Sequence, residues 1–132
     1  MKKQSTVWVW IIVLVVLVGG LIGLLVAEGK KPGKYDELAQ CITDSGAKFY
    51  GTFWCPHCQA QKALFGKSAK KLPYIECSTK DAKGQTQICI DNNIQSYPTW
   101  ELADGTRLQT ESTAGVSLKT LAEKTNCPAP TK

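Results

Sequence analysis

Residues 47–65 read AKFYGTFWCPHCQAQKALF. The first part, residues 47–53, is a run of aromatic and small residues that is typical of a buried strand. The last part, residues 59–65, consists mostly of good helix formers. Cys55 therefore lies where a strand ends and a helix begins, with Pro56 at the first helical position, which favours proline.

The spacing of Cys55 and Cys58 indicates a redox couple or part of a metal site. Because the free N–H groups at a helix start favour negative charge, we expect a lowered pKa for the Cys55 thiol, an exposed side chain and a nucleophilic role. Cys58 is expected to be shielded and to resolve the mixed disulfide. A protonated His57 beside the Cys55 thiolate would stabilise it further. Because a stabilised thiolate favours the dithiol state, the Pro56-His57 dipeptide predicts an oxidant.

The chain of 132 residues holds one domain and one appendage. The appendage is residues 7–27, an uncharged apolar run whose length suits a membrane-spanning helix. A cleaved signal peptide is the alternative, but its apolar region is normally shorter, and residues 25–27 form a poor cleavage site. We therefore predict a retained anchor. Gly19 and Gly23 form a GxxxG pair that could let two anchors pack, although one match in a glycine-rich span is weak support.

The domain boundaries and the sidedness follow from charge and cysteine usage. Lysines flank the apolar run on both sides, so the positive-inside rule does not fix its orientation. Six cysteines in a small domain indicate an oxidising compartment. We predict a cytoplasmic tail (residues 1–6), a transmembrane signal-anchor helix (7–27), a polar tether (28–34) and a domain (35–132) on the periplasmic or extracellular side of the cytoplasmic membrane. The net charge of +5 includes the membrane flanks, and no aromatic–basic pattern indicates nucleic acid.

The domain alternates between expected strands and helices. The expected helices are 36–45, the segment from Cys55 to Lys71, 85–93, and a last helix capped by Ser117; the expected strands are 47–53, 73–77, 99–102 and 107–110. This order predicts an α/β domain with a mixed central sheet flanked by helices.

Three short motifs carry a resemblance to a known fold. They are Trp54-Cys55-x-x-Cys58 after a strand, Tyr97-Pro98-Thr99, and Asp104-Gly105 in a hairpin turn. Together with the order of elements, they resemble the thioredoxin fold. The resemblance implies that Tyr97, Pro98 and Thr99 form the family's cis-proline loop, which presents backbone groups to a substrate peptide. An exposed Trp54 would contact the same substrate.

A narrower resemblance concerns the reaction. Pro56-His57 is similar to the oxidants of the DsbA type. Residues 49–59 and 97–101 most resemble the thioredoxin-like domains fused to, or partnered with, bacterial vitamin K epoxide reductase homologues. This resemblance, over about residues 35–127, implies reoxidation by a quinone-linked membrane partner. Phe49 replaces the buried aspartate of thioredoxins, which weakens a reductase interpretation and leaves open whether Glu76 or a water serves as the base for Cys58.

The other four cysteines can pair in three ways. Cys77 closes a strand and Cys89 lies on the next helix, so a local bond is easily formed. Cys41 and Cys127 lie near the two ends of the domain and can link them. We favour these two pairs as structural disulfides, because closing a long loop stabilises a small domain. A second redox pair that relays electrons is the alternative.

We therefore predict a membrane-anchored thiol–disulfide oxidoreductase that oxidises client proteins through the Cys55–Cys58 disulfide and needs no bound cofactor. Neither a second C-x-x-C pair nor a second histidine completes a zinc site, and Gln59 in place of histidine disfavours covalent haem. Two alternatives remain: a disulfide reductase or isomerase of the same fold, and a non-catalytic module that binds peptides in the Tyr97-Pro98 groove.

Overall fold

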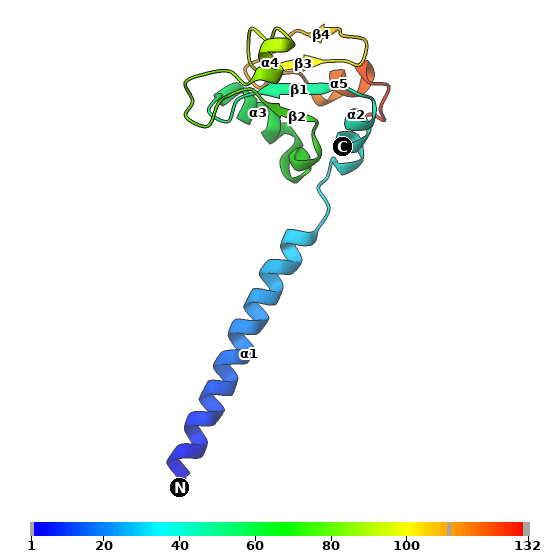
Figure 1. The fold of residues 1–132 in the computed structure, drawn as a ribbon. Coiled ribbons are helices and arrows are strands. Elements are labelled where there is room, and N and C mark those ends of the chain that lie inside the picture. Colours follow the sequence, from blue (N-terminus) through cyan, green and yellow to red (C-terminus); the bar gives the residue numbers. More distant parts are fainter. Residues whose placement is uncertain (1, 111, 131–132) are drawn as a thin grey trace. The chain divides into compact units, whose positions relative to one another are not determined.

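The computed structural model describes residues 2–110 and 112–130. The chain divides into two units, Met1–Pro32 and Gly33–Lys132. The first unit contains helix α1, Lys2–Lys30. The second contains α2 (Asp36–Asp44), β1 (Lys48–Gly51), α3 (Pro56–Phe65), the 3-10 helix η1 (Gly66–Lys71), β2 (Tyr74–Glu76), α4 (Gln87–Asp91), β3 (Thr99–Glu101), β4 (Arg107–Leu108) and α5 (Leu118–Lys124), as labelled in Figure 1.

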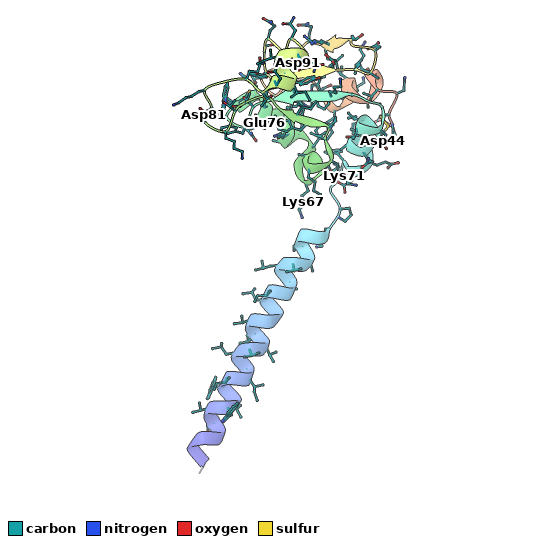
Figure 2. All side chains as sticks on the ribbon, in the orientation of Figure 1. Asp44, Lys67, Lys71, Glu76, Asp81 and Asp91 are labelled. Carbon is teal, nitrogen blue, oxygen red and sulfur yellow. A yellow bond between two sulfur atoms is a disulfide. The ribbon has the colours of Figure 1, made fainter. Side chains whose placement is uncertain are left out.

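Helix α1 contains a segment, Thr6–Glu28, that is long and apolar enough to cross a membrane. The predicted span of residues 7–27 lies within it, and the helix continues beyond that span at both ends. Figure 2 shows side chains projecting on all sides of α1, and its large apolar side chains are exposed. A helix that is apolar all round suits a lipid environment.

The second unit is built on a four-stranded sheet with the order β2-β1-β3-β4. Strands β1 and β2 are parallel, with Phe49 opposite Tyr74 and Gly51 opposite Glu76. Strand β3 is antiparallel to both β1 and β4. The predicted α/β fold with a mixed sheet is therefore confirmed.

Strand β1 separates two apolar clusters because successive side chains of a strand point to opposite faces. Phe49 belongs to the larger cluster, which includes residues of α2, α3 and α5, and its ring stacks on Trp100 at 4.6 Å. Tyr50 belongs to the smaller cluster, around Cys77 and Cys89 beneath α4. Helices α3 and α4 thus cover opposite faces of the sheet (Figure 1). The larger cluster fixes α3, which carries the C-x-x-C motif.

Two helix boundaries differ from the prediction. Helix α3 ends at Phe65 because Gly66 adopts a φ of +54°, and the chain continues to Lys71 as a 3-10 helix. Helix α4 is shorter than the expected 85–93, because Thr86 is extended, with a ψ of 150°, and Asn93 adopts a φ of +50°. The predicted C-terminal end of α2 and the predicted start of α5 are confirmed. Gly46, with a φ of +81°, follows α2, and the Ser117 hydroxyl caps α5.

Candidate active site

Cys55 is the N-cap residue of α3, and Pro56 follows at the first helical position, as predicted. The backbone N–H of Cys58 donates to the Cys55 sulfur, with N and Sγ 3.3 Å apart. An N–H group directed at a sulfur from the first turn of a helix stabilises a thiolate. The strand-to-helix junction therefore positions one cysteine at the point where a helix best supports negative charge.

The expected exposure of Cys55 is wrong. Only 5% of this residue is accessible, and its sulfur lies 3.8 Å from the backbone carbonyl oxygen of Tyr97. The loop before β3 covers the sulfur, and the sequence motif around Cys55 contains no information about that loop's path. The Tyr97 carbonyl therefore forms part of the immediate surroundings of the Cys55 sulfur.

Cys58 is fully buried, as predicted. Burial, together with the contact with Cys55, raises the pKa of the Cys58 thiol to about 12, while the Thr52 backbone and the Lys62 charge act in the opposite direction. Both cysteines of the motif are free thiols, so the structure represents the reduced form. Cys58 is therefore a thiol at neutral pH, and it needs help whenever it must carry charge.

The His57 ring is held by a backbone group of a distant loop. Its side chain is exposed, and its Nδ1 atom lies 2.8 Å from the backbone oxygen of Thr113. A carbonyl oxygen only accepts hydrogen bonds, so Nδ1 carries the proton and donates it. The imidazole thus links α3 to the loop before α5, a loop whose position the sequence motif did not reveal.

Aromatic side chains border Cys55. Trp54 is about half exposed at 52%, and its Nε1 donates to the Ser78 hydroxyl oxygen 2.9 Å away. The Trp54 and Tyr97 rings meet edge to face, with centroids 6.3 Å apart. The Tyr97–Pro98 peptide bond is cis. Trp54 and Tyr97 therefore lie together beside Cys55, and the cis-proline loop that the resemblance implies is present.

Thr99 differs from the other residues expected to bind a client. Its side chain is buried, and its hydroxyl donates to the backbone oxygen of Ser96, 2.7 Å away. This hydroxyl holds the loop that leads into β3 and is not available to a bound peptide.

Glu76, one of the two candidates for the Cys58 base, is the centre of a hydrogen-bond network. Its carboxylate accepts bonds from the Tyr74 hydroxyl at 2.9 Å and from the backbone N–H groups of Ser78 at 2.9 Å and Phe53 at 3.2 Å. Burial and the bond to Glu76 raise the pKa of Tyr74, so its hydroxyl remains a donor. Glu76 therefore ties β2 to the loop that leads to Cys55.

Three residues near Cys58 were not predicted from the sequence: Gly51, Lys62 and Tyr74. A Cβ atom on Gly51 would lie 3.0 Å from the Cys58 sulfur and 2.9 Å from Cε2 of Tyr74. The Lys62 ammonium lies over the Tyr74 ring, 3.3 Å from its centroid. Helical spacing could have indicated Lys62, which follows Cys58 by four residues, whereas Tyr74 requires the register of β1 and β2.

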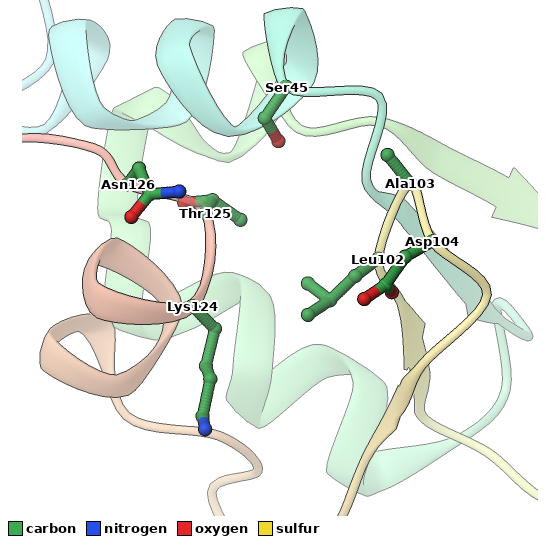
Figure 3. Close-up of a pocket in the computed structure, with 7 residues that line it drawn as sticks. All are labelled: Ser45, Leu102, Ala103, Asp104, Lys124, Thr125 and Asn126. Atoms are coloured by element: carbon green, nitrogen blue, oxygen red, sulfur yellow. The ribbon is translucent and has the colours of Figure 1, made fainter.

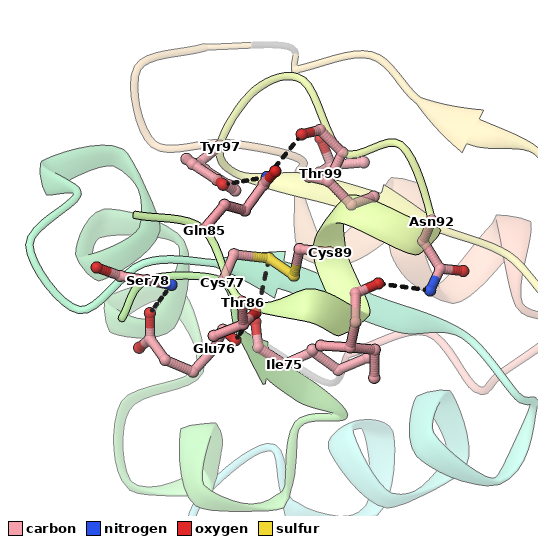
Figure 4. The surroundings of a disulfide bond; sticks show 12 residues. Ile75, Glu76, Cys77, Ser78, Gln85, Thr86, Cys89, Asn92, Tyr97 and Thr99 are labelled. Carbon is pink, nitrogen blue, oxygen red and sulfur yellow. Dashed lines mark hydrogen bonds between the residues drawn. A yellow bond between two sulfur atoms is a disulfide. The ribbon is translucent and has the colours of Figure 1, made fainter. Parts of the chain in front are cut away.

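Two disulfides, Cys41–Cys127 and Cys77–Cys89, are present, in the pairing that we favoured. Figure 4 shows the second bond, which joins the end of β2 to α4. Cys77 and Cys89 are fully buried, so a client thiol cannot reach this bond. The burial supports a structural role for the pair and disfavours an electron relay.

A hollow on another part of the domain contains no predicted site residue. It lies between the end of α2, the turn from β3 to β4 and the end of α5 (Figure 3). Its lining residues are Ser45, Leu102, Ala103, Asp104, Lys124, Thr125 and Asn126. None of the residues that the sequence predicts for thiol–disulfide exchange therefore lines this hollow.

The fold and the C-x-x-C geometry agree with a family match. The thioredoxin family model matches residues 29–126. The chain belongs to the thioredoxin family.

Curated proteins that are similar to the chain include an oxidoreductase and a protein with a thioredoxin domain. The thiol-disulfide oxidoreductase LTO1 of Arabidopsis thaliana is 45% identical over 71 residues, which cover 51% of this chain and 19% of that protein. The thioredoxin domain-containing protein 5 homolog of Drosophila melanogaster is 32% identical over 97 residues, which cover 65% of this chain and 22% of that protein. The chain thus spans about a fifth of the length of these relatives.

Proposed function

We propose that this protein is a membrane-anchored thiol–disulfide oxidoreductase that oxidises client proteins through Cys55 and Cys58. The observation that carries the proposal is the Cys55 sulfur, which receives the Cys58 N–H at the start of α3 and lies beside the Tyr97 carbonyl. Family membership and the similarity to a protein named as a thiol-disulfide oxidoreductase support the same chemistry.

The proposed reaction begins with the Cys55–Cys58 disulfide. A client thiolate attacks the Cys55 sulfur, a client–Cys55 disulfide forms, and Cys58 leaves with the electron pair of the broken bond and takes a proton. A second client thiolate then attacks the client sulfur of the mixed disulfide. The client leaves with a new disulfide, and the protein keeps two thiols and both electrons. Trp54, Tyr97 and Pro98 hold the client next to Cys55.

The oxidising direction rests on how the reduced form is stabilised. The helix N–H group at the Cys55 sulfur supports a thiolate, and a stabilised thiolate makes a dithiol easier to form and the disulfide a stronger oxidant. Phe49 occupies the position at which thioredoxins carry a buried aspartate, and its ring stacks on Trp100. The acidic group of the reductases is therefore absent from this position.

The partner and the location belong to the same proposal. The resemblance to domains associated with vitamin K epoxide reductase homologues supports a quinone-linked membrane protein as the reoxidant. The apolar helix α1 would keep the domain at the membrane surface close to that partner. Two disulfides in the domain support a position outside the cytoplasm.

The experiment mixes the oxidised full-length protein, in detergent, with an equal amount of a peptide that contains two thiols. We expect one disulfide per protein in the peptide, no product with Cys55→Ala, and a reduction potential nearer to about −120 mV than to about −270 mV. A potential near the lower value overturns the oxidising direction and supports a reductase or isomerase. No exchange at all supports the non-catalytic binding module.

A further inference from the structure

Cys58 must carry a negative charge during exchange in either direction, although it is fully buried. This inference rests on the proposed function. When a client thiolate attacks Cys55, the Cys55–Cys58 bond breaks and Cys58 leaves as a thiolate that then takes a proton from solvent. In the reverse step, the Cys58 thiol gives its proton to solvent, and its thiolate attacks Cys55 and releases the client thiolate. The Cys58 thiolate thus appears transiently in both directions.

One positive charge is held close to this sulfur. Lys62 follows Cys58 by four residues, so both side chains lie on the same face of α3. The Lys62 ammonium lies 3.3 Å from the centroid of the Tyr74 ring. That ring and the Cys58 sulfur both approach the Cβ position of Gly51, at 2.9 and 3.0 Å. The Tyr74 ring therefore holds the ammonium on the side of the sheet where Cys58 is buried.

The neighbouring groups leave this charge available to Cys58. Among the described residues, no carboxylate forms an ion pair with Lys62. The Glu76 carboxylate is occupied by the Tyr74 hydroxyl and two backbone N–H groups.

Among the described residues, the other groups that act on the pKa of Cys58 carry no positive charge. Tyr74 of β2 has a raised pKa and is neutral, and Cys55 at the start of α3 contributes only negative charge when ionised. The imidazole of His57 donates to Thr113 instead. On β1, the residue next to the Cys58 sulfur is Gly51, which has no titratable side chain. The positive charge of Lys62 accordingly opposes the effect of burial on the pKa of Cys58.

We propose that Lys62 is a positioning residue for disulfide exchange: its ammonium, held over the Tyr74 ring, stabilises the transient thiolate of Cys58. Cys58 is a thiol in the stable reduced form and a disulfide sulfur in the oxidised form. Lys62 therefore changes the rate in both directions by the same factor and leaves the equilibrium between the two forms unchanged.

The test compares Lys62→Met, which removes the charge and keeps an unbranched side chain, with Lys62→Arg, which keeps the charge. Each is made in the full-length protein in detergent, and exchange with glutathione is followed in both directions by stopped-flow fluorescence. We expect Lys62→Met to slow both directions about three- to tenfold, the effect of roughly one pKa unit after the compensating gain in nucleophilicity. Lys62→Arg should retain most of the rate, and the reduction potential should remain unchanged.

Lys124→Met is the matched control, because Lys124 is an exposed lysine on α5 that lines a different hollow of the domain. It should exchange at the wild-type rate. The inference is overturned if Lys62→Met is as fast as wild type, if Lys62→Arg is as slow as Lys62→Met, or if the potential shifts enough to account for the slower rate. A wild-type protein that forms no mixed disulfide with glutathione overturns the proposed function itself, which is a separate result.

Discussion

At the scale of single residues, the two cysteines of the motif differ because they occupy different positions in one helical turn. Cys55 precedes the helix and receives an N–H group, whereas Cys58 lies inside the first turn and is completely enclosed. Burial favours the neutral form of a thiol, and a helix start favours the charged form. One cysteine is therefore suited to attack and the other to resolve, because they lie three residues apart at the start of one helix.

Gly51 leaves the space that Cys58 and Tyr74 occupy, so Gly51→Ala should destabilise the domain. The added Cβ would lie 3.0 Å or less from an atom of each neighbour, and such overpacking typically costs about 1–3 kcal/mol. Urea unfolding at neutral pH measures this loss.

Gly84→Ala is the matched control for this substitution. A Cβ on Gly84 would meet its nearest neighbour, Thr79, at an ordinary distance of 3.4 Å. Equal stability of the two variants would show that the space beside Gly51 is not restricted.

The raised pKa of Cys58 predicts a loss of stability in alkali. In the unfolded chain this thiol ionises near pH 9.0, whereas in the folded protein it keeps its proton to about pH 12. Between these values the folded state binds a proton that the unfolded state has lost, so the free energy of unfolding decreases as pH rises. With only the Cys55–Cys58 bond reduced, urea unfolding at pH 8 to 10.5 should show a steeper decrease for wild type than for Cys58→Ala. Parallel curves for the two proteins would contradict the prediction.

At the scale of helices and strands, the sequence contains enough information for the order of elements and for the start of α3. Pro56, Gly46 and Ser117 mark helix ends through local chemistry, and local chemistry is readable from sequence. The contacts of Lys62 with Tyr74 depend on how β1 pairs with β2, a long-range feature that no short motif encodes. The loop around Tyr97 likewise covers Cys55 through a long-range contact that no short motif encodes.

The two disulfides should stabilise the elements that they join to different extents. Chain-entropy arguments give about 3 kcal/mol for a closed loop of 12 residues, as in Cys77–Cys89, and about 4.5 kcal/mol for one of 86 residues, as in Cys41–Cys127. We expect the double alanine variant of Cys41 and Cys127 to lose more stability in urea unfolding.

Both double variants should still oxidise a peptide with two thiols at a temperature at which they remain folded. If the Cys77 and Cys89 variant were folded but inactive, the pair would act in electron transfer, contrary to its structural assignment.

At the scale of the whole molecule, the anchor should be retained. The protein should stay with the membrane pellet after alkaline carbonate extraction, and its intact mass should include residues 7–27. Val16→Arg is the control, because arginine at the centre of a spanning helix disfavours insertion by about 3 kcal/mol. A soluble product whose mass lacks these residues would support the cleaved signal peptide.

The central claim is that the sulfur of Cys55 exchanges with client proteins, and trapping tests it most directly. In the full-length Cys58→Ala protein, expressed in its membrane and quenched with acid, the Cys55 thiolate attacks a client disulfide, in the reverse of the second proposed exchange step, and releases one client thiolate. The mixed disulfide that forms has no internal thiol to resolve it. Mass spectrometry should find client peptides joined to the peptide that contains Cys55, and none when Cys55 is also replaced by alanine. Absence of such linkages, or linkages only through Cys41, Cys77, Cys89 or Cys127, would contradict the claim.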